Sequence, residues 1–274
     1  MTFSARRTRR TLQVAGAGAA ALLALSACSS SGSSSSGSGS SAAGSSSPKL
    51  SGNVTVFAAA SLKESFTTLG KDFEKAHPGT KVTFSFGGSD TLAASITGGA
   101  PADVFAAASP KTMAIVTDKK DAAGTPATFV RNQLEIATLP GNPDKVASLK
   151  DLTKPGLKVV LCAETVPCGA AAQKALQAGS LKLTPVSYEQ DVKSALNKVV
   201  LKEADAAVVY RTDVKAAGGT VEGVDFPESA GAVNDYPIVL LKNAPNAAAA
   251  KAFIQLVQSP EGRQVLTGAG FLKP

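Results

Sequence analysis

The sequence predicts an α/β protein with two lobes, and three observations support this. After residue 50, short runs rich in β-branched residues alternate with helix-like segments of about ten to fifteen residues, the pattern of βαβ units with mostly parallel sheets. Two such series within about 225 residues favour two lobes over a single sheet. Residues 29–47 contain only Ser, Gly and Ala and cannot form a core, so the folding part of the chain begins at about Pro48.

Residues 1–27 have the pattern of a signal peptide. Four arginines precede an apolar run, residues 12–25, that is too short to span a bilayer comfortably. The run ends in Leu25-Ser26-Ala27-Cys28, which resembles the bacterial lipobox, where the cysteine is acylated and begins the mature protein. A free cysteine at an ordinary cleavage site is the alternative, and both the Sec and the twin-arginine export routes stay open. We therefore expect an exported protein, anchored to the outer face of the cell membrane through lipidated Cys28, with residues 28–49 as a Ser/Gly tether.

The charge of the mature chain does not indicate a nucleic-acid partner. The formal charge of the whole chain is +7, but four of its 28 basic residues lie in the signal peptide. The remainder has 24 basic and 21 acidic residues, a net +3. Such a small positive excess, spread over a surface of mixed charge, favours solubility. It does not indicate the basic patch that binds a nucleic acid.

The first helix of the mature chain is the one with the clearest signals. Residues 61–77 carry four apolar side chains at helical spacing, Leu62, Phe66, Leu69 and Phe73. Ser61 and Glu64 have the S-x-x-E spacing of a capping box, and Pro78-Gly79 ends the helix.

The other elements follow from the same periodicities. Expected strands are residues 54–57, 81–86, 103–107, 134–138, 158–162, 206–210 and 238–241. Expected helices are residues 91–97, 110–117, 169–178, 191–200 and 247–257.

The sequence lacks the recognisable motifs in which most enzymes place their catalytic side chains. The chain has no phosphate-binding glycine loop, no H-E-x-x-H and no C-x-x-C. Its single histidine, His77, lies at a helix end, so no serine has a nearby base to activate it. Asp103 and Asp205 lie in or beside strands without a paired spacing that would indicate acid–base catalysis. The chain is therefore expected to be a binding protein and not an enzyme, with a surface hydrolase or an adhesive lipoprotein as alternatives from other classes.

Small hydroxyl residues and tight turns join several strands to the helices that follow. Ser61 and Ser89 each stand at such a junction, and Val166-Pro167-Cys168-Gly169 and Asp191-Val192 open helices of the second half. A helix N-terminus has unpaired N–H groups and a partial positive charge, which together favour anions. The alternative is that Ser61 and Ser89 only cap their helices, the commonest role of serine there.

Five segments, in order, resemble the molybdate-binding proteins of ABC importers. They are Val56-Phe57-Ala58-Ala59-Ala60-Ser61-Leu62, Ser85-Phe86-Gly87-Gly88-Ser89, Gly99-Ala100-Pro101-Ala102-Asp103-Val104-Phe105, Val166-Pro167-Cys168-Gly169 and Ala207-Val208-Val209-Tyr210. A sixth segment, residues 231–239, resembles that family's return crossover. The resemblance implies a type II periplasmic-binding-protein-like fold with two crossover segments. Residues 50–131 and 236–274 would form lobe I, and residues 132–235 lobe II.

The resemblance also implies a ligand site without a cofactor or a metal cation. The oxyanion would be held by the hydroxyls and neighbouring amides of Ser61 and Ser89, by the backbone amides of Cys168 and Val192, and by the phenol of Tyr210. Two positions depart from the family pattern. Asp90 replaces a position that is often a hydroxyl residue and would repel an anion if it faced the site; Cys168 replaces a small residue, which matters little if only its amide binds.

A site made only of donors suits a fully deprotonated tetrahedral dianion. Molybdate and tungstate have four acceptor oxygens, whereas the O–H of a protonated phosphate would meet another donor, an unpaired contact that costs about 1–3 kcal/mol. Sulfate passes the same test, so a sulfate or other oxyanion receptor is the alternative within the class. The implied partners are a small oxyanion and an ABC transporter permease in the membrane, with the receptor itself a monomer.

Cys162 and Cys168 are candidates for a disulfide. Cys162 ends an expected strand, Cys168 begins the next helix, and export places both where disulfides persist. With Cys28 acylated they are the only thiols left to pair, and two cysteines without histidine partners make a poor zinc site. Two unlinked cysteines are the alternative.

Overall fold

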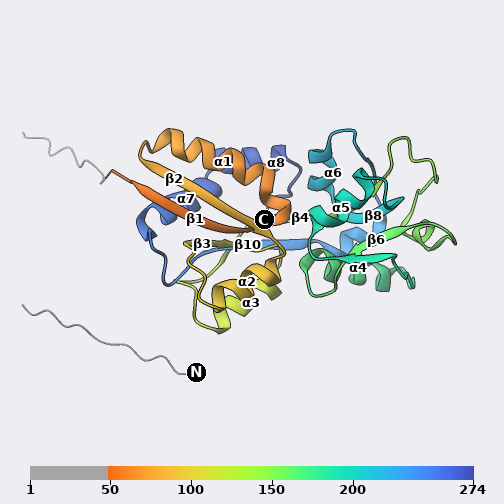
Figure 1. Ribbon diagram of the computed structural model, residues 1–274, viewed down its shortest axis with the longest axis horizontal. Coiled ribbons are helices and arrows are strands. Elements are labelled where there is room, and N and C mark those ends of the chain that lie inside the picture. The colour runs from red at the N-terminus through yellow and green to blue at the C-terminus, as the bar shows by residue number, and fades with distance from the viewer. Residues whose placement is uncertain (1–48) are drawn as a thin grey trace, which may run out of the picture. The chain divides into compact units, whose positions relative to one another are not determined.

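The computed structural model describes residues 49–274, which form two five-stranded sheets (Figure 1). The signal peptide, Cys28 and nearly all of the tether lie outside the described residues. The first sheet contains β1 (Gly52–Ala59), β2 (Thr80–Gly87), β3 (Val104–Ala106), β4 (Ala127–Asn132) and β10 (Asn234–Leu240). The second contains β5 (Leu134–Thr138), β6 (Val159–Cys162), β7 (Ser187–Glu189), β8 (Ala206–Tyr210) and β9 (Glu222–Val224). Of the described helices, none is long and apolar enough to cross a membrane.

The two sheets have the same pattern of strand directions. Their strand orders are β2-β1-β3-β10-β4 and β7-β6-β8-β5-β9. In the first sheet β10 is antiparallel to both neighbours, and in the second β5 is, while the other pairs are parallel. Four of the five strands in each sheet therefore run in one direction, which confirms the expected mostly parallel sheets. Each sheet, with its helices, is one lobe.

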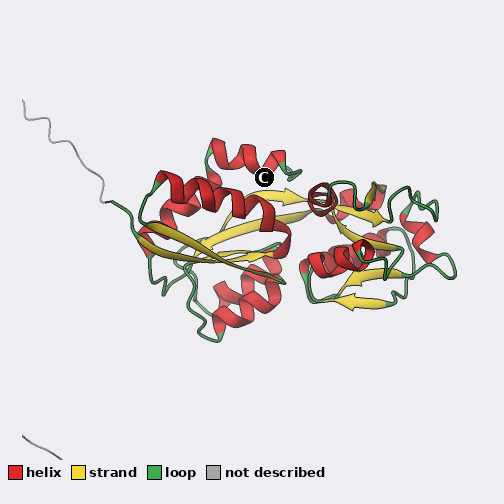
Figure 2. Cartoon of the chain, turned by 45° about the horizontal axis from the view of Figure 1, so that its top comes forward, coloured by secondary structure: helices red, strands yellow, loops and turns green. Residues whose placement is uncertain are grey.

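Helices cover both faces of the first sheet. One face packs against α1 (Lys63–Ala76), α7 (Ala247–Gln258) and α8 (Pro260–Gly268), through buried rings such as Phe66 and Phe253, whose centroids lie 5.9 Å apart. The other face packs against α2 (Ser89–Thr97) and α3 (Pro110–Asp118), through Leu92 and Met113. Figures 1 and 2 show the two groups of helices on opposite sides of the sheet.

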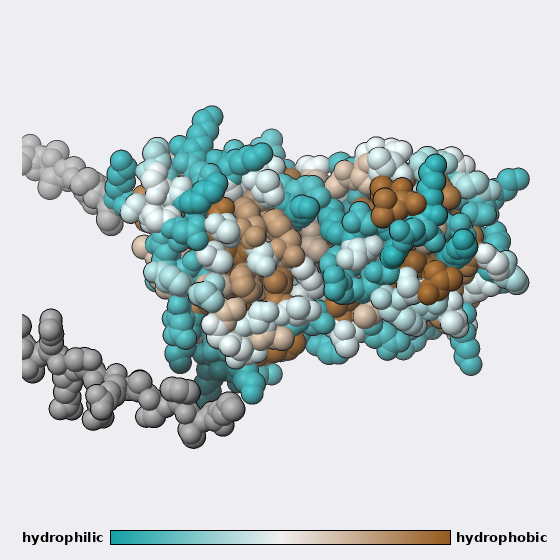
Figure 3. Space-filling view, in the orientation of Figure 1, coloured by the Kyte–Doolittle hydropathy of each residue, from teal (hydrophilic) through white to brown (hydrophobic). Residues whose placement is uncertain are grey.

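The second sheet is covered by shorter helices around one core. They are η2 (Leu149–Thr153), α4 (Pro167–Ala178), α5 (Val192–Val200), α6 (Arg211–Ala217) and η3 (Pro227–Ala232). Their buried faces share a cluster that includes Leu161, Leu176, Leu196 and Val208. With the large apolar residues inside, the face drawn in Figure 3 is largely hydrophilic, with apolar side chains in separate patches.

Two crossovers connect the lobes. Only Gln133 separates β4 in the first sheet from β5 in the second. The chain returns at η3 and β10, so β10 begins beside the second lobe and ends within the first sheet. The lobe boundaries expected after residues 131 and 235 fall inside β4 and β10.

The predicted capping box at the start of the first helix is wrong. The chain makes a 3-10 turn, η1 (Ala60–Leu62), before α1, and no side chain caps either helix. The Ser61 hydroxyl instead bonds to that of Tyr236 at 2.8 Å, and Glu64 pairs with Lys193 at 2.9 Å. Partners from distant parts of the chain have replaced the local bonds that the spacing indicated.

Candidate functional site

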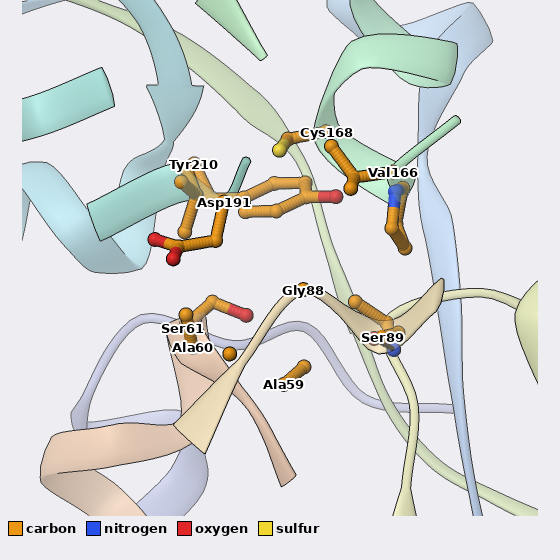
Figure 4. Close-up of a pocket in the computed structure, with 13 residues that line it drawn as sticks. Ala59, Ala60, Ser61, Gly88, Ser89, Val166, Cys168, Asp191 and Tyr210 are labelled. Atoms are coloured by element: carbon orange, nitrogen blue, oxygen red, sulfur yellow. Dashed lines mark hydrogen bonds between the residues drawn. The ribbon is translucent and has the colours of Figure 1, made fainter. Parts of the chain in front are cut away.

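All five residues expected to bind a ligand line a single pocket between the two lobes. The first lobe contributes Ala59, Ala60, Ser61, Gly87, Gly88, Ser89 and Ala108, and the second contributes Val166, Pro167, Cys168, Asp191, Val192 and Tyr210. In Figure 4 the labelled residues of the two lobes face each other across this space. The cavity is small. The volume that the centre of a water-sized sphere can occupy is about 20 Å³. A single water molecule needs about 10–15 Å³ of such volume. The pocket therefore suits a small ion and not a sugar or a peptide.

Three α-helices of nine residues or more begin at this pocket. The residues that precede α2, α4 and α5 are Gly88, Val166 and Asp191, and all three line it. No side chain caps α2 or α4, so the free N–H groups of their first turns are left for a ligand. The helix dipoles add partial positive charge at the pocket, whose lining contains no basic side chain.

The two serine hydroxyls do not cap their helices. The Ser89 Oγ, on a residue that is 1% exposed, accepts a hydrogen bond from the backbone N–H of Ala108 at 3.0 Å. The Ser61 Oγ lies 2.8 Å from the Tyr236 hydroxyl. Each oxygen thus has a protein partner, and at Ser89 that partner is a donor, so the Ser89 hydrogen is left for another acceptor. The capping-only alternative is contradicted by these contacts.

The Tyr210 phenol is a hydrogen-bond donor at any ordinary pH. Burial raises the pKa of Tyr210 well above its usual range, and the nearby Tyr236 hydroxyl raises it further. The Asn234 side-chain amide donates to the Tyr210 oxygen at 2.7 Å. The Tyr210 N–H, in turn, donates to the buried Asp213 carboxylate at 3.2 Å, which fixes the start of α6.

A disulfide joins Cys162 at the end of β6 to Cys168 in the first turn of α4, with the two Cα atoms 5.8 Å apart. Gly169 follows, and a Cβ there would collide with the backbone carbonyls of Cys162 and Ala163. The start of α4 is therefore held tightly against the end of β6. This contact fixes the direction of the Cys168 backbone amide.

The two acidic groups nearest the pocket differ in their partners: the buried Asp90 Oδ1 has no hydrogen-bond partner among the described residues, whereas Asp191 has one. Asp90, which could repel an anion, does not belong to the lining. Asp191 does line the pocket, and its Oδ1 accepts the Ser194 N–H at 2.9 Å as the cap of α5. Sequence reasoning placed Asp191 at a helix start but did not identify it as a pocket residue.

An ion-pair network crosses from one lobe to the other beside the pocket. The Lys193 ammonium lies 2.9 Å from Glu64 in the first lobe and 3.1 Å from Asp213 in the second. Burial lowers the pKa of Lys193, but the two carboxylates outweigh this effect and raise it. Burial likewise raises the pKa of Asp213, to about 6, although Lys193 opposes that shift. Nothing in the local sequence around Lys193 indicated this arrangement.

Gly88 lies close to the second lobe. A Cβ on Gly88 would lie 2.6 Å from the Gln190 carbonyl oxygen and 3.2 Å from the Val166 side chain, both in the second lobe. A Cβ on the adjacent Gly87 would meet nothing nearer than 3.9 Å.

Gly88→Ala is therefore expected to hold the lobes apart and to weaken ligand binding by about 1–3 kcal/mol, the usual cost of overpacking. Gly268→Ala is the matched control and should bind normally, because a Cβ there would meet nothing within 4 Å and Gly268 does not line the pocket. Titration calorimetry of both variants measures the difference, and equal affinities would contradict a closed pocket at Gly88.

Comparison with known proteins agrees with this architecture. A family model for bacterial extracellular solute-binding proteins matches residues 54–272. The chain is 44% identical to the molybdate-binding protein ModA of Mycobacterium tuberculosis over 222 residues, 81% of this chain and 85% of that protein. It is 34% identical to the molybdate-binding protein ModA of Escherichia coli over 234 residues, 80% of this chain and 89% of that protein.

The fold is also found in a solved structure. The periplasmic molybdate-binding protein of Azotobacter vinelandii superposes with a TM-score of 0.71 at 22% identity, covering 81% of this chain and 99% of that one. The type II two-lobed fold expected from the sequence is thus confirmed. Since the family model covers all but a few of the described residues and close relatives match along most of their length, this chain belongs to the family of bacterial extracellular solute-binding proteins.

Proposed function

We propose that this protein is an extracytoplasmic receptor that binds molybdate, and tungstate with it, between its lobes and delivers it to an ABC transporter permease. The observation that carries the proposal is a small pocket lined by donors from both lobes and by no basic side chain. Ser61 and Ser89 contribute from one side, and Tyr210 with the Cys168 and Val192 amides from the other. The relatives named molybdate-binding proteins support the same ligand.

Donor groups on every side select for an ion without protons. A tetrahedral dianion accepts hydrogen bonds at each oxygen, while the O–H of hydrogen phosphate would leave a buried donor unpaired at a cost of about 1–3 kcal/mol. Sulfate matches the donors equally well and is the second candidate. Because Mo–O bonds are longer than S–O bonds, the distance between the two lobes in the closed state decides between them.

A thermal-shift series tests the proposal directly. Purified residues 49–274 are titrated with molybdate, tungstate, sulfate and phosphate. Because a ligand that binds only the folded state raises its stability, molybdate at a hundredfold excess over its Kd should add about 2.7 kcal/mol. Stabilisation by sulfate alone would favour the second candidate, and no shift with any of the four would refute an oxyanion receptor.

Replacing Ser61 or Ser89 with Ala is expected to weaken molybdate binding by about 1–3 kcal/mol, the range for a hydrogen bond to a charged group. Thr112→Ala is the control, because the Thr112 side chain is also buried and its hydroxyl is bonded, at 3.0 Å to the Ser109 carbonyl, but it does not line the pocket. Calorimetric affinities and urea unfolding are measured on all three variants. Unchanged affinity in both pocket variants would remove these serines from the site.

We propose further that the two lobes move as units, residues 50–131 with 236–274 against residues 132–235, and that lipidated Cys28 keeps the receptor at the membrane. The short crossovers at Gln133 and η3 support the first point, because they are the two connections at which rotation can occur. The lipobox resemblance at residues 25–28 supports the second.

Cys28→Ser is expected to move the protein from the membrane fraction to the soluble fraction or to block its processing. Fractionation of cells that express the full chain, followed by immunoblotting, measures this. The pocket variant Ser89→Ala should remain in the membrane fraction. Normal processing and membrane association of Cys28→Ser would contradict lipidation.

A further inference from the structure

Two asparagine side chains stand behind the pocket hydroxyls without lining the pocket. Asn132, at the end of β4, is completely buried, and Asn234, at the start of β10, is half-buried. They lie at the two crossovers between the lobes. Asn132 reaches Tyr236, the partner of Ser61, and Asn234 reaches Tyr210 itself.

Neighbouring groups fix which end of each amide faces the tyrosine. The Asn132 Oδ1 accepts the Gln133 backbone N–H at 3.0 Å, and a backbone N–H can only donate. The Asn234 Nδ2 donates to the Pro167 carbonyl at 3.2 Å, and a carbonyl can only accept. In both side chains, therefore, the NH₂ group is the one that points at the phenol oxygen.

The direction of hydrogen bonding then passes from Asn132 to Ser61. Asn132 Nδ2 donates to the Thr212 hydroxyl at 2.8 Å and to the Tyr236 hydroxyl at 3.3 Å. We assign the Tyr236 proton to the bond with the Ser61 Oγ, 2.8 Å away, because the Tyr236 oxygen already accepts from Asn132; the distance alone allows either hydroxyl to donate. Since Ser61 Oγ accepts that proton, its own hydrogen is free to point into the pocket.

The Tyr210 hydroxyl is oriented directly by an asparagine, without an intervening tyrosine. Its oxygen accepts from Asn234 at 2.7 Å, so an acceptor site of the phenol is filled from behind. The pKa values of both tyrosines are raised by burial, so both phenols keep their protons. The Tyr210 hydrogen is thereby left for the neighbouring Tyr236 oxygen or for a ligand oxygen.

We propose that Asn132 and Asn234 are positioning residues that set the polarity of the pocket, making Ser61 and Tyr210 donors and so selecting fully deprotonated oxyanions over protonated ones. This inference rests on the proposed function. It assigns the selectivity to side chains that do not touch the ligand.

Asn132→Asp should reverse the donor and acceptor roles in the hydrogen bonds from residue 132 through Tyr236 to Ser61. The side chain keeps nearly the same size and shape. A carboxylate would still accept the Gln133 N–H, and the Thr212 and Tyr236 hydroxyls can both rotate to donate to its second oxygen. Tyr236 would then accept from Ser61, which would present a lone pair to the ligand. Molybdate affinity should fall by about tenfold or more beyond the effect of the added charge.

A double-mutant cycle separates the relay from the charge. Asn132→Asp is measured alone and in the Tyr236→Phe background, where the added charge persists but the relay is absent. We expect the loss of molybdate affinity to be at least about tenfold larger with Tyr236 present, and the molybdate-to-phosphate affinity ratio to fall only there. Equal losses in both backgrounds would overturn the inference.

Asn234→Ala tests the second arm, including the case in which Asn132→Asp fails to fold. With the Tyr210 hydroxyl free to rotate, the molybdate-to-phosphate ratio should fall about tenfold, while a purely structural role would weaken both ligands equally. An unchanged ratio counts against the inference. Wild-type protein is titrated in parallel. If it binds molybdate and the variants keep its molybdate-to-phosphate affinity ratio, only the positioning role fails. If the wild-type protein binds no oxyanion, the proposed function fails as well.

Discussion

Replacing Lys193 with Met is expected to lower the free energy of unfolding by about 3–5 kcal/mol, because it leaves the Asp213 carboxylate buried without a counter-charge. Asp213 is 0% exposed and lies 3.1 Å from the Lys193 ammonium. The same substitution removes the 2.9 Å contact with Glu64 in the other lobe. Ligand affinity should therefore fall together with stability, since this contact is made only when the lobes are close.

The control lies on the same helix. Lys198 pairs with Glu203 at 2.6 Å on the surface of α5, and Lys198→Met should leave stability nearly unchanged, as is usual for exposed ion pairs. Adding Asp213→Asn to Lys193→Met removes the orphaned charge and should recover most of the lost stability. Urea unfolding of the four proteins measures these effects. If Lys193→Met and Lys198→Met changed the free energy of unfolding equally little, the buried ion pair would not contribute to stability.

Removing the disulfide is expected to lower the free energy of unfolding by about 2–2.5 kcal/mol, the chain-entropy estimate for a closed loop of about seven residues. For a domain of this size that corresponds to a melting temperature lower by about 5–10 °C. Cys162→Ala with Cys168→Ala is the suitable variant, because both cysteines are buried in an apolar cluster. Oxyanion affinity should fall too, because the Cys168 amide would no longer be fixed in direction.

Reduction provides the matched experiment. Dithiothreitol should destabilise the wild-type protein and have no effect on the double variant. Mass spectrometry of the unreduced protein after alkylation tests the premise. Two freely alkylated thiols in the native, oxidised protein would show that no bridge exists there.

Local sequence patterns were sufficient to predict most of the elements that hold the lobes together. The strands Leu134–Thr138 and Ala206–Tyr210 were predicted with their observed ends, because each is a fully apolar or alternating run between polar breaks. The strands β4, β7 and β9 and the helices α6 and α8 were not predicted. The strands β7 and β9 have three residues each and are partly or fully exposed, so they exist only through pairing with β6 and β5.

The sequence by itself determined which helices would begin at one end of the sheets and which small hydroxyl residues would stand there, because caps, glycines and periodicity are local properties. Only the tertiary structure decided what those hydroxyls do. Ser61 and Tyr236 are 175 positions apart and Asn132 and Tyr236 are 104 apart, so no spacing rule could connect them. A hydroxyl can donate or accept according to its neighbours, and here those neighbours come from strands and helices that only the fold brings together.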